Sequence, residues 1–338
     1  MQTFRDYMEA ALYDPERGYY IRRVPTEDFY TAPELHPVFA AVLARQIARQ
    51  LDSLKAAGVA GPYSVVELGS GSGILAREIL KRLKEESPPW AQSIRYILVD
   101  RSRNALLDSI ISLSASYERV MGCSRLEDVL PCSGVFFSNE LLDAFPVHLL
   151  EKRDGGVYEV YVEESGRTLL SELSRGELKP FADAIGPRLE EGERHAVNLE
   201  ALRWLRTVSE KLKEGTLVTI DYGKRFSGAP NPPRAFHRHS RDERLTEDKG
   251  LKDITASVDF DAMIHEGKQL GFQLESYGTL ARFMLDGGIA EWFEQADKQG
   301  AIPSFKSRAK MKTLIHPEGM GEVFKVLIQR KKHLEPLP

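Results

Sequence analysis

The chain has 338 residues, of which 42% are hydrophobic and 28% are charged, and its formal net charge is −4. This composition is ordinary for a globular protein in water, and the small negative charge argues against broad attraction to nucleic acid or anionic lipid. No apolar run is long enough for a transmembrane helix, and the two cysteines exclude a disulfide-rich scaffold.

The N-terminal residues show neither the apolar core of a signal peptide nor the Arg- and Ser-rich character of a transit peptide. The two cysteines, Cys123 and Cys132, have no metal-ligand partners at useful spacing, which suits a reducing compartment. We therefore expect a cytoplasmic protein that does not associate with membranes.

Apolar patterning predicts helices and strands in alternation along the chain. A helical lead is expected over 1–62, with a long helix from about 37 to 57. The pattern then predicts strands beginning at 65 and spanning 93–100, 118–122, 134–138, 216–221, 272–278 and 322–329, with helices at 77–84, 104–114, 201–213 and 260–270. Residues 147–198 lie between the fourth and fifth strands, and within them VYEVYVEES alternates in strand fashion before a turn at Ser165-Gly166, which predicts a small inserted hairpin layer. Together these elements predict a mainly parallel α/β sheet covered on both faces.

The stretch VVELGSGSGILAREIL, residues 65–80, predicts a strand, a glycine turn and a helix. The dinucleotide fingerprint needs a glycine where Ile74 stands, and a P-loop needs a Gly-Lys-Ser/Thr that is missing here. Glycines at every second position let the backbone approach a ligand closely. An acidic strand end suits S-adenosylmethionine, which has an ammonium, a sulfonium and a ribose but no phosphate. The predicted cofactor-binding residues are Glu67, Gly69, Ser70, Gly71 and Gly73, and a tight turn without a ligand is the alternative.

An acidic residue, Asp100, closes the next strand of this βαβ unit. A carboxylate in this position is placed to accept hydrogen bonds from ribose hydroxyls, so Asp100 is predicted to bind the cofactor. The alternative is that Asp100 caps the helix that begins near Arg103.

Further polar side chains follow the fourth and fifth strands, where ligands gather in open α/β sheets. Glu140 and Asp143 are three residues apart and share a face if a helical turn begins there, while Asn139 can offer its amide to the cofactor. Asp221 closes the fifth strand at the same edge. Because carboxylates can hydrogen-bond a cationic methyl acceptor, Glu140, Asp143 and Asp221 are the candidate catalytic residues. The alternatives are first-turn acids that complement a helix dipole and an ordinary turn aspartate.

Six blocks in a fixed order carry a resemblance to a known family. They are FRDYMEAALYDPERGYY, the glycine turn, FFSNELLDAFPV, VTIDYG, DITASVDF and HPEGMGEVFKVLIQ. In this order they resemble the MidA-like family, which includes the mitochondrial complex I assembly methyltransferase. The resemblance extends from Phe4 to about Arg330.

The resemblance implies a Rossmann-like, seven-stranded class I methyltransferase sheet with an antiparallel last strand. It implies a lead over 1–62 that covers the active site and a methyltransferase domain over 63–330 with an insertion at about 147–198. It also implies methyl transfer from S-adenosylmethionine, with S-adenosylhomocysteine as product, to an arginine of a protein partner related to a respiratory complex. A small-molecule or nucleic-acid methyltransferase and a non-catalytic cofactor-binding assembly factor stay open as alternatives.

Two departures and one charged loop complete the sequence evidence. Asp100 stands where the family more often has Glu, and Ser257 stands where it usually has His. The Arg- and His-rich run over 234–244 is interrupted by acids, so we expect no nucleic-acid partner. His237 and His239 have no nearby cysteine, so we expect no metal site.

Overall fold

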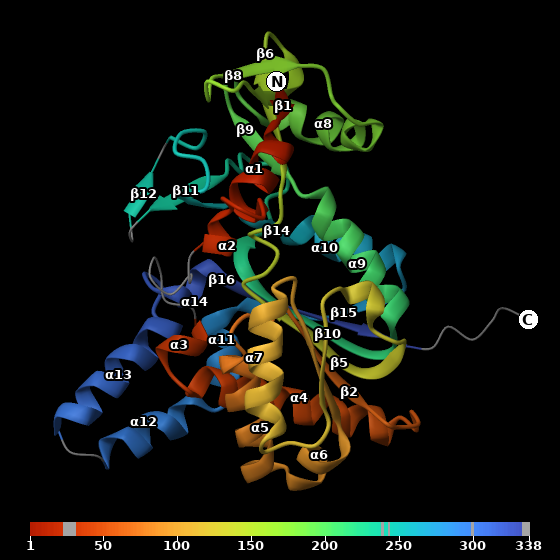
Figure 1. The fold of residues 1–338 in the computed structure, drawn as a ribbon, viewed down its shortest axis with the longest axis vertical. Helices are drawn as coiled ribbons and strands as arrows, with labels where there is room; N and C mark the ends of the chain where they lie inside the picture. The colour runs from red at the N-terminus through yellow and green to blue at the C-terminus, as the bar shows by residue number, and fades with distance from the viewer. Residues whose placement is uncertain (23–31, 238–239, 243, 299–300, 333–338) are drawn as a thin grey trace, which may run out of the picture. The chain divides into compact units, whose positions relative to one another are not determined.

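The structure is a computed structural model that describes residues 1–22, 32–237, 240–242, 244–298 and 301–332 (Figure 1). The chain forms two compact units, each assembled from three segments. Unit 1 comprises 1–30, 142–204 and 223–263, and unit 2 comprises 31–141, 205–222 and 264–338. None of the helices in the described part of the chain is long and apolar enough to span a membrane.

Seven strands of unit 2 lie side by side in one sheet, in the order β15-β16-β10-β5-β2-β3-β4. The strands are β2 (Ser64–Leu68), β3 (Arg95–Val99), β4 (Val120–Cys123), β5 (Cys132–Asn139), β10 (Leu212–Lys224), β15 (Phe272–Thr279) and β16 (Phe324–Lys331). Strands β4, β3, β2, β5 and β10 pair in parallel. Strand β16 runs antiparallel to both β10 and β15. This arrangement confirms the predicted class I methyltransferase sheet with its antiparallel last strand.

The helices of unit 2 pack against this sheet. They are α3 (Ala32–Leu35), α4 (Val38–Ala56), α5 (Ile74–Glu86), α6 (Pro88–Ser93), α7 (Arg103–Ser114), α11 (Leu280–Asp286), α12 (Ile289–Asp297), α13 (Ala301–Ile315) and α14 (Met320–Val323). Leu43 and Ile47 of α4 and Ile79 of α5 are fully buried, in one apolar cluster with Val65 and Phe137 of the strands. Such burial gives each large side chain about 1.5–3 kcal/mol of hydrophobic stabilisation, so α4 is part of the core.

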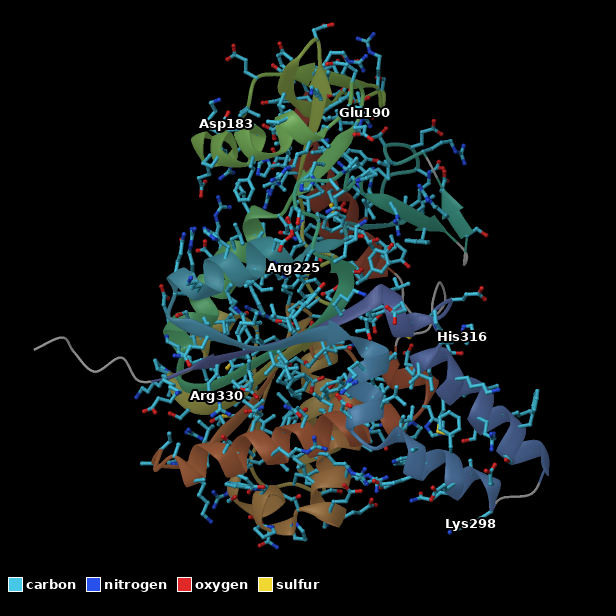
Figure 2. All side chains as sticks on the ribbon, turned by 180° about the vertical axis from the view of Figure 1, so that it is seen from behind. Asp183, Glu190, Arg225, Lys298, His316 and Arg330 are labelled. Carbon is cyan, nitrogen blue, oxygen red and sulfur yellow. The ribbon has the colours of Figure 1, made fainter. Side chains whose placement is uncertain are left out.

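Arg330 of β16, labelled in Figure 2, ties α4 to the sheet by polar contacts. Its guanidinium donates to Gln50 Oε1 at 2.8 Å, to Ser53 Oγ at 2.9 Å and to Glu275 of β15 at 3.1 Å. Gln50 is itself buried and accepts a bond from Thr216 Oγ1 of β10 at 2.9 Å. The polar network therefore satisfies the buried amide while it holds α4 to three strands.

Unit 1 is built around α1 (Phe4–Tyr13) and a second sheet. Thr3 caps α1 by accepting from the Asp6 N–H, and the buried face of the helix has helical spacing at Phe4, Met8 and Leu12. The second sheet joins β1 (Gln2–Thr3), β6 (His148–Arg153), β7 (Gly156–Val162), β8 (Thr168–Ser171) and β9 (Arg194–Val197). The inserted layer is thus larger than the predicted hairpin, because β1 pairs with β7 and β9 pairs with β6.

Shorter elements complete unit 1 (Figure 1). They are α2 (Tyr19–Arg22), α8 (Lys179–Ile185), β11 (Arg234–His237), β12 (Ser240–Asp242), β13 (Asp253–Thr255) and β14 (Val258–Asp259). Helices α9 (Leu199–Lys211) and α10 (Phe260–Gln269) contain residues of both units. The domain boundaries expected from the sequence, and the covering role expected for residues 1–62, stay predictions.

Candidate functional site

The glycine turn leaves β2 at the carboxyl edge of the unit 2 sheet. The backbone N–H groups of Gly69 and Ser70 donate to Val99 O of β3, at 2.8 and 3.2 Å. Gly69, Gly71 and Gly73 all have positive φ, at 78°, 50° and 71°. Only glycine adopts such angles at little cost, so the predicted strand, turn and helix follow directly from these residues.

The three glycines face different surroundings. A Cβ on Gly69 would lie 2.9 Å from the Leu141 side chain, and one on Gly73 would lie 2.6 Å from Ser109 Oγ. A Cβ on Gly71 would meet no atom of the described residues within 4 Å. Gly69 and Gly73 therefore allow close packing, whereas Gly71 borders space that the protein leaves open.

A second feature of the turn fits a polar ligand. Ser70 is 6% exposed, and its buried Oγ has no hydrogen-bond partner among the described residues. Buried hydroxyls are normally bonded, so an unpartnered one in this turn fits a ligand with polar groups. S-adenosylmethionine supplies such groups, and when bound it supplies a methyl group on a positively charged sulfonium.

Asp100 holds the turn as well as the next helix start. One carboxylate oxygen accepts from the Gly71 N–H at 2.8 Å and the other accepts from the Ser102 N–H at 2.8 Å. The helix cap is Ser102, whose side chain accepts from the Ala105 N–H, so capping by Asp100 was the wrong alternative. Its predicted contact with ribose hydroxyls stays a prediction, which the position beside Gly71 supports.

Glu67 lies inside the sheet and has a partner that the sequence did not suggest. It is 3% exposed, and Tyr96 of β3 donates a hydrogen bond to its Oε2 at 2.7 Å. Burial raises the pKa of Glu67 to about 8; the bond from Tyr96 lowers it and the charge of Asp100 raises it. The sequence gives no signal for Tyr96, because a tyrosine in an apolar strand is typical of an ordinary core residue.

Glu140 follows β5 in a conformation that is unusual for its residue type. Its φ is 51°, and its N–H donates to Ile220 O of β10 at 3.0 Å. Its Oε1 accepts from Asn139 Nδ2 at 3.0 Å and from the Ala32 N–H at 3.1 Å. Positive φ at a non-glycine residue costs about 1–3 kcal/mol and clusters at functional sites, so the structure fixes this carboxylate at a strained strand end.

Asp221 ends up next to Glu140, as the parallel pairing of β5 and β10 predicts, but its carboxylate is fully buried. It accepts from the backbone N–H groups of Leu141 and Tyr222, at 3.2 and 2.8 Å. These bonds hold the segment after Glu140, which suggests a positioning role. The predicted catalytic role of Asp221 stays a prediction.

Asp143 belongs to unit 1, and the predicted helical turn that would join it to Glu140 is wrong. The chain forms bends and turns after β5, so no helical turn places Glu140 and Asp143 on one face. The Asp143 carbonyl accepts from the Ala256 N–H at 2.9 Å, which anchors this turn beside the end of β13.

Two tyrosines and a second aspartate share the surroundings of Asp143. The rings of Tyr13 and Tyr20 stack with centroids 5.5 Å apart, and Tyr20 donates to Asp253 Oδ1 at 3.0 Å. Tyr13 donates to Ala144 O at 2.9 Å. Burial raises the pKa of Tyr20 well above its ordinary value, and the charges of Asp253 and Asp143 add to the rise. Tyr20 and Asp253 lie far apart in sequence, so their pairing could not be predicted, although both lie in blocks of the resemblance.

Burial also raises the pKa of Asp143 to about 6, although N–H groups of Ala144 and Asp143 itself oppose the rise. Among the described residues no lysine or arginine forms an ion pair with Asp143. We call Tyr13, Tyr20, Asp143 and Asp253 the tyrosine–aspartate cluster.

Ser257 and the two histidines His237 and His239 are the remaining residues that the sequence analysis named. Ser257 lines a cavity of about 20 Å³, room for a single water, and His195 of β9 lines the same cavity. An imidazole is therefore present near the position where the family usually has one. The side chains of His237 and His239 lie outside the described residues, and within the described part no group of three His, Cys, Asp or Glu could hold a metal ion.

The sheet, the open glycine turn and the acidic edge define a class I S-adenosylmethionine-dependent methyltransferase. The family described as "Putative S-adenosyl-L-methionine-dependent methyltransferase" matches residues 42–278, more than half of the chain, and the chain belongs to this MidA-like family. A crystal structure of a candidate methyl transferase from Burkholderia thailandensis, bound to S-adenosyl-homocysteine, is 31% identical with a TM-score of 0.81. The match covers 99% of this chain and 89% of that one.

Curated relatives carry a more specific name. The mitochondrial protein arginine methyltransferase NDUFAF7 of Danio rerio is 27% identical over 94% of this chain and 81% of its own length. The Drosophila melanogaster homolog is 28% identical over 79% of this chain and 66% of its own length. These matches agree with the resemblance found in the sequence.

Proposed function

We propose that the protein transfers methyl groups to an arginine of a protein partner. The carboxylate of Glu140, which two hydrogen bonds fix at the end of β5, carries this proposal. Carboxylates bind a guanidinium by charge-assisted hydrogen bonds. The names of the relatives from Danio rerio and Drosophila melanogaster support the same acceptor.

In this proposal Glu140 hydrogen-bonds the acceptor guanidinium. An arginine spreads its charge over three nitrogens, and a carboxylate that binds two of them leaves the third more nucleophilic. The bonds from Asn139 and Ala32 fix the carboxylate before the acceptor arrives, so little reorganisation is needed during the reaction. Asp221 contributes by accepting a hydrogen bond from the backbone N–H of Leu141, the residue after Glu140.

The tyrosine–aspartate cluster has a separate task in the proposal, which is to recognise a cationic side chain of the partner. The bond from Tyr20 keeps the Asp253 carboxylate in place, and the stacked ring of Tyr13 offers an aromatic face. Without a paired lysine or arginine nearby in the described structure, Asp143 gains more from an incoming cation than an already neutralised acid would.

We also propose that the partner is a protein rather than a nucleic acid and that the protein acts in the cytoplasm. The chain carries more acidic than basic residues, which disfavours a polyanionic partner. Neither Cys123 nor Cys132 forms a disulfide, which fits a reducing compartment. Cell fractionation with a compartment marker tests the location.

Labelling identifies the acceptor. Cell lysate is incubated with methyl-labelled S-adenosylmethionine and the protein, and labelled material is separated, hydrolysed and analysed as amino acids. Label in methylated arginine supports the proposal. Label confined to small molecules, to nucleic acid or to another amino acid contradicts it, and no label above the Gly71→Val variant indicates an assembly factor without turnover.

A further inference from the structure

Helix α13 is held to unit 2 by one of its faces. Met311 and Leu314 on that face are fully buried in the apolar cluster of the unit. Ser307 lies on the same side, and its Oγ bonds to His36 Nε2 at 2.9 Å. Helix α12 packs beside α13, as Figure 1 shows. The inner face of α13 is therefore anchored by apolar and polar contacts within unit 2.

The outer face of α13 combines one large aromatic side chain with three lysines. It consists of exposed residues only, which are Phe305, Lys306, Ala309, Lys310, Lys312 and Thr313. We call this set the basic face. At 3.6 residues per turn its members fall within one arc about 160° wide. Phe305, which is 75% exposed, and Ala309 lie in the middle of the arc, with lysines on both sides.

The positive charges of the basic face are not neutralised within the described part of the chain, where none of its three lysines takes part in an ion pair or a hydrogen bond. On the flank of the same helix, by contrast, Arg308 pairs with Asp297 and lies 5.7 Å from the centre of the Phe293 ring. Residues 301–315 contain four basic residues and no acidic one, although acids outnumber bases in the whole chain. Unpaired positive charge is therefore concentrated on the outer side of α13.

We propose that the basic face binds an acidic segment of a protein partner, with an apolar side chain of that segment against Phe305. An apolar centre with a polar rim is the usual anatomy of a protein interface. Lysine carries a compact charge on a flexible stem, so the flanking ammonium groups can follow the carboxylates of the segment. The small side chain of Ala309 leaves room for the apolar side chain beside the exposed ring.

Two other anionic partners match the basic face less well. A helix that lies in a membrane surface buries a broad apolar stripe, whereas Phe305 is the one large apolar side chain of this set. Nucleic-acid phosphates are matched best by the guanidinium fork, and the single arginine of α13, Arg308, is already paired with Asp297. The face from 305 to 313 is about 12 Å long, which suits two helical turns of a peptide.

The inference extends the proposed function, because it concerns where a protein partner is held and not which of its atoms accepts the methyl group. It depends on neither the cofactor nor the arginine acceptor. The lysines are exposed, so binding of an acidic segment should weaken as the salt concentration rises.

Fluorescence anisotropy tests the inference with a labelled helical peptide of about 14 residues, near the length at which an isolated helix becomes stable. One face of the peptide carries leucines flanked by glutamates, and a second peptide has lysine in place of each glutamate. The full chain should bind the acidic peptide and not the basic one. Lys306→Glu combined with Lys310→Glu should weaken this binding about tenfold or more, since two attractive pairs become repulsive. Phe305→Ala should weaken it about fivefold through lost apolar contact.

Lys81→Glu combined with Lys213→Glu is the matched control, because it makes the same charge change at exposed lysines of α5 and β10. It should leave peptide binding unchanged, and every variant should bind S-adenosylmethionine as the wild type does, which checks the fold. Four results would each overturn the inference. They are no binding of the acidic peptide to the wild type, equal binding by Lys306→Glu/Lys310→Glu, an equal loss in the control, and tighter binding to phosphatidylserine vesicles or duplex DNA than to the peptide. A dimer in ultracentrifugation that dissociates in Lys306→Glu/Lys310→Glu would also overturn it, by assigning the face to a second copy, whereas the arginine acceptor depends on the labelling result alone.

Discussion

Replacement of Gly71 by valine separates ligand binding from backbone strain. At φ 50° a valine costs about 1–2 kcal/mol of folding free energy, because its Cβ crowds the following carbonyl. Its methyl groups would enter space in which no atom of the described residues lies within 4 Å of the new Cβ. The folding cost is therefore limited to strain, while the cofactor loses the space it needs.

The size of the binding defect follows from the contacts at stake. A displaced cofactor forfeits the hydrogen bond expected at Ser70 and at least one further bond to the turn, each worth about 1–1.5 kcal/mol. Together these losses amount to about 2–3 kcal/mol, or an affinity lowered about 30- to 150-fold.

Gly58→Val is a matched control. Gly58 also has positive φ, at 80°, and lies in unit 2, and an added Cβ there would have no atom of the described residues within 4 Å. Both variants should unfold at similarly lowered temperatures, and calorimetry with S-adenosylmethionine should show a defect in Gly71→Val alone. Wild-type affinity in a folded Gly71→Val protein would show that the open space at the turn is not the cofactor site.

Three further variants test other parts of the account. Asp100→Ala should weaken cofactor binding by about 1.5–3 kcal/mol, the scale of a bond to a charged group, and an analogue without ribose hydroxyls should bind wild type and variant almost equally; a variant that still discriminates fully would leave Asp100 as a tether of the turn. Because the folded pKa of Asp143 is raised to about 6, above an ordinary value near 3.9, ionisation of Asp143 destabilises the fold as pH rises from about 4 to 6. In urea unfolding, the free energy of unfolding of Asp143→Asn should not fall over this pH range. An identical pH profile of that free energy in both proteins would contradict the burial argument. Tyr20→Phe removes one hydrogen bond to the Asp253 carboxylate and should raise the KM for a protein partner several-fold at unchanged cofactor affinity, whereas an unchanged KM would remove the cluster from partner recognition.

The sequence predicted most of the unit 2 sheet, because apolar strands and glycine turns are local signals. The turn over 69–73, Asp100 and the carboxyl ends of β5 and β10 all lie at one edge, since parallel strands that start in register end together. The antiparallel β16 followed from family resemblance, and its pairing with β10 confirms it.

The grouping of the acidic residues was not predictable in the same way. Residues 140–147 contain leucine, alanine and phenylalanine at helical spacing, yet the positive φ of Glu140 starts a different path. Asp143 is therefore found with Tyr20 and Asp253, which are close in space through pairing of distant segments. Local patterns carry no information about such contacts, and the same holds for Tyr96 beside Glu67.

The central claim is that Glu140, the residue after β5, hydrogen-bonds a cationic methyl acceptor. Glu140→Gln keeps the shape of the side chain and removes its charge. With the methyl-accepting partner found by labelling, single-turnover transfer should fall about a hundredfold, the scale for loss of one positioned electrostatic group. Cofactor affinity should stay within about twofold of wild type, because the lost interaction strengthens as the transition state forms. Transfer at the wild-type rate would contradict the carboxylate mechanism and the arginine acceptor with it.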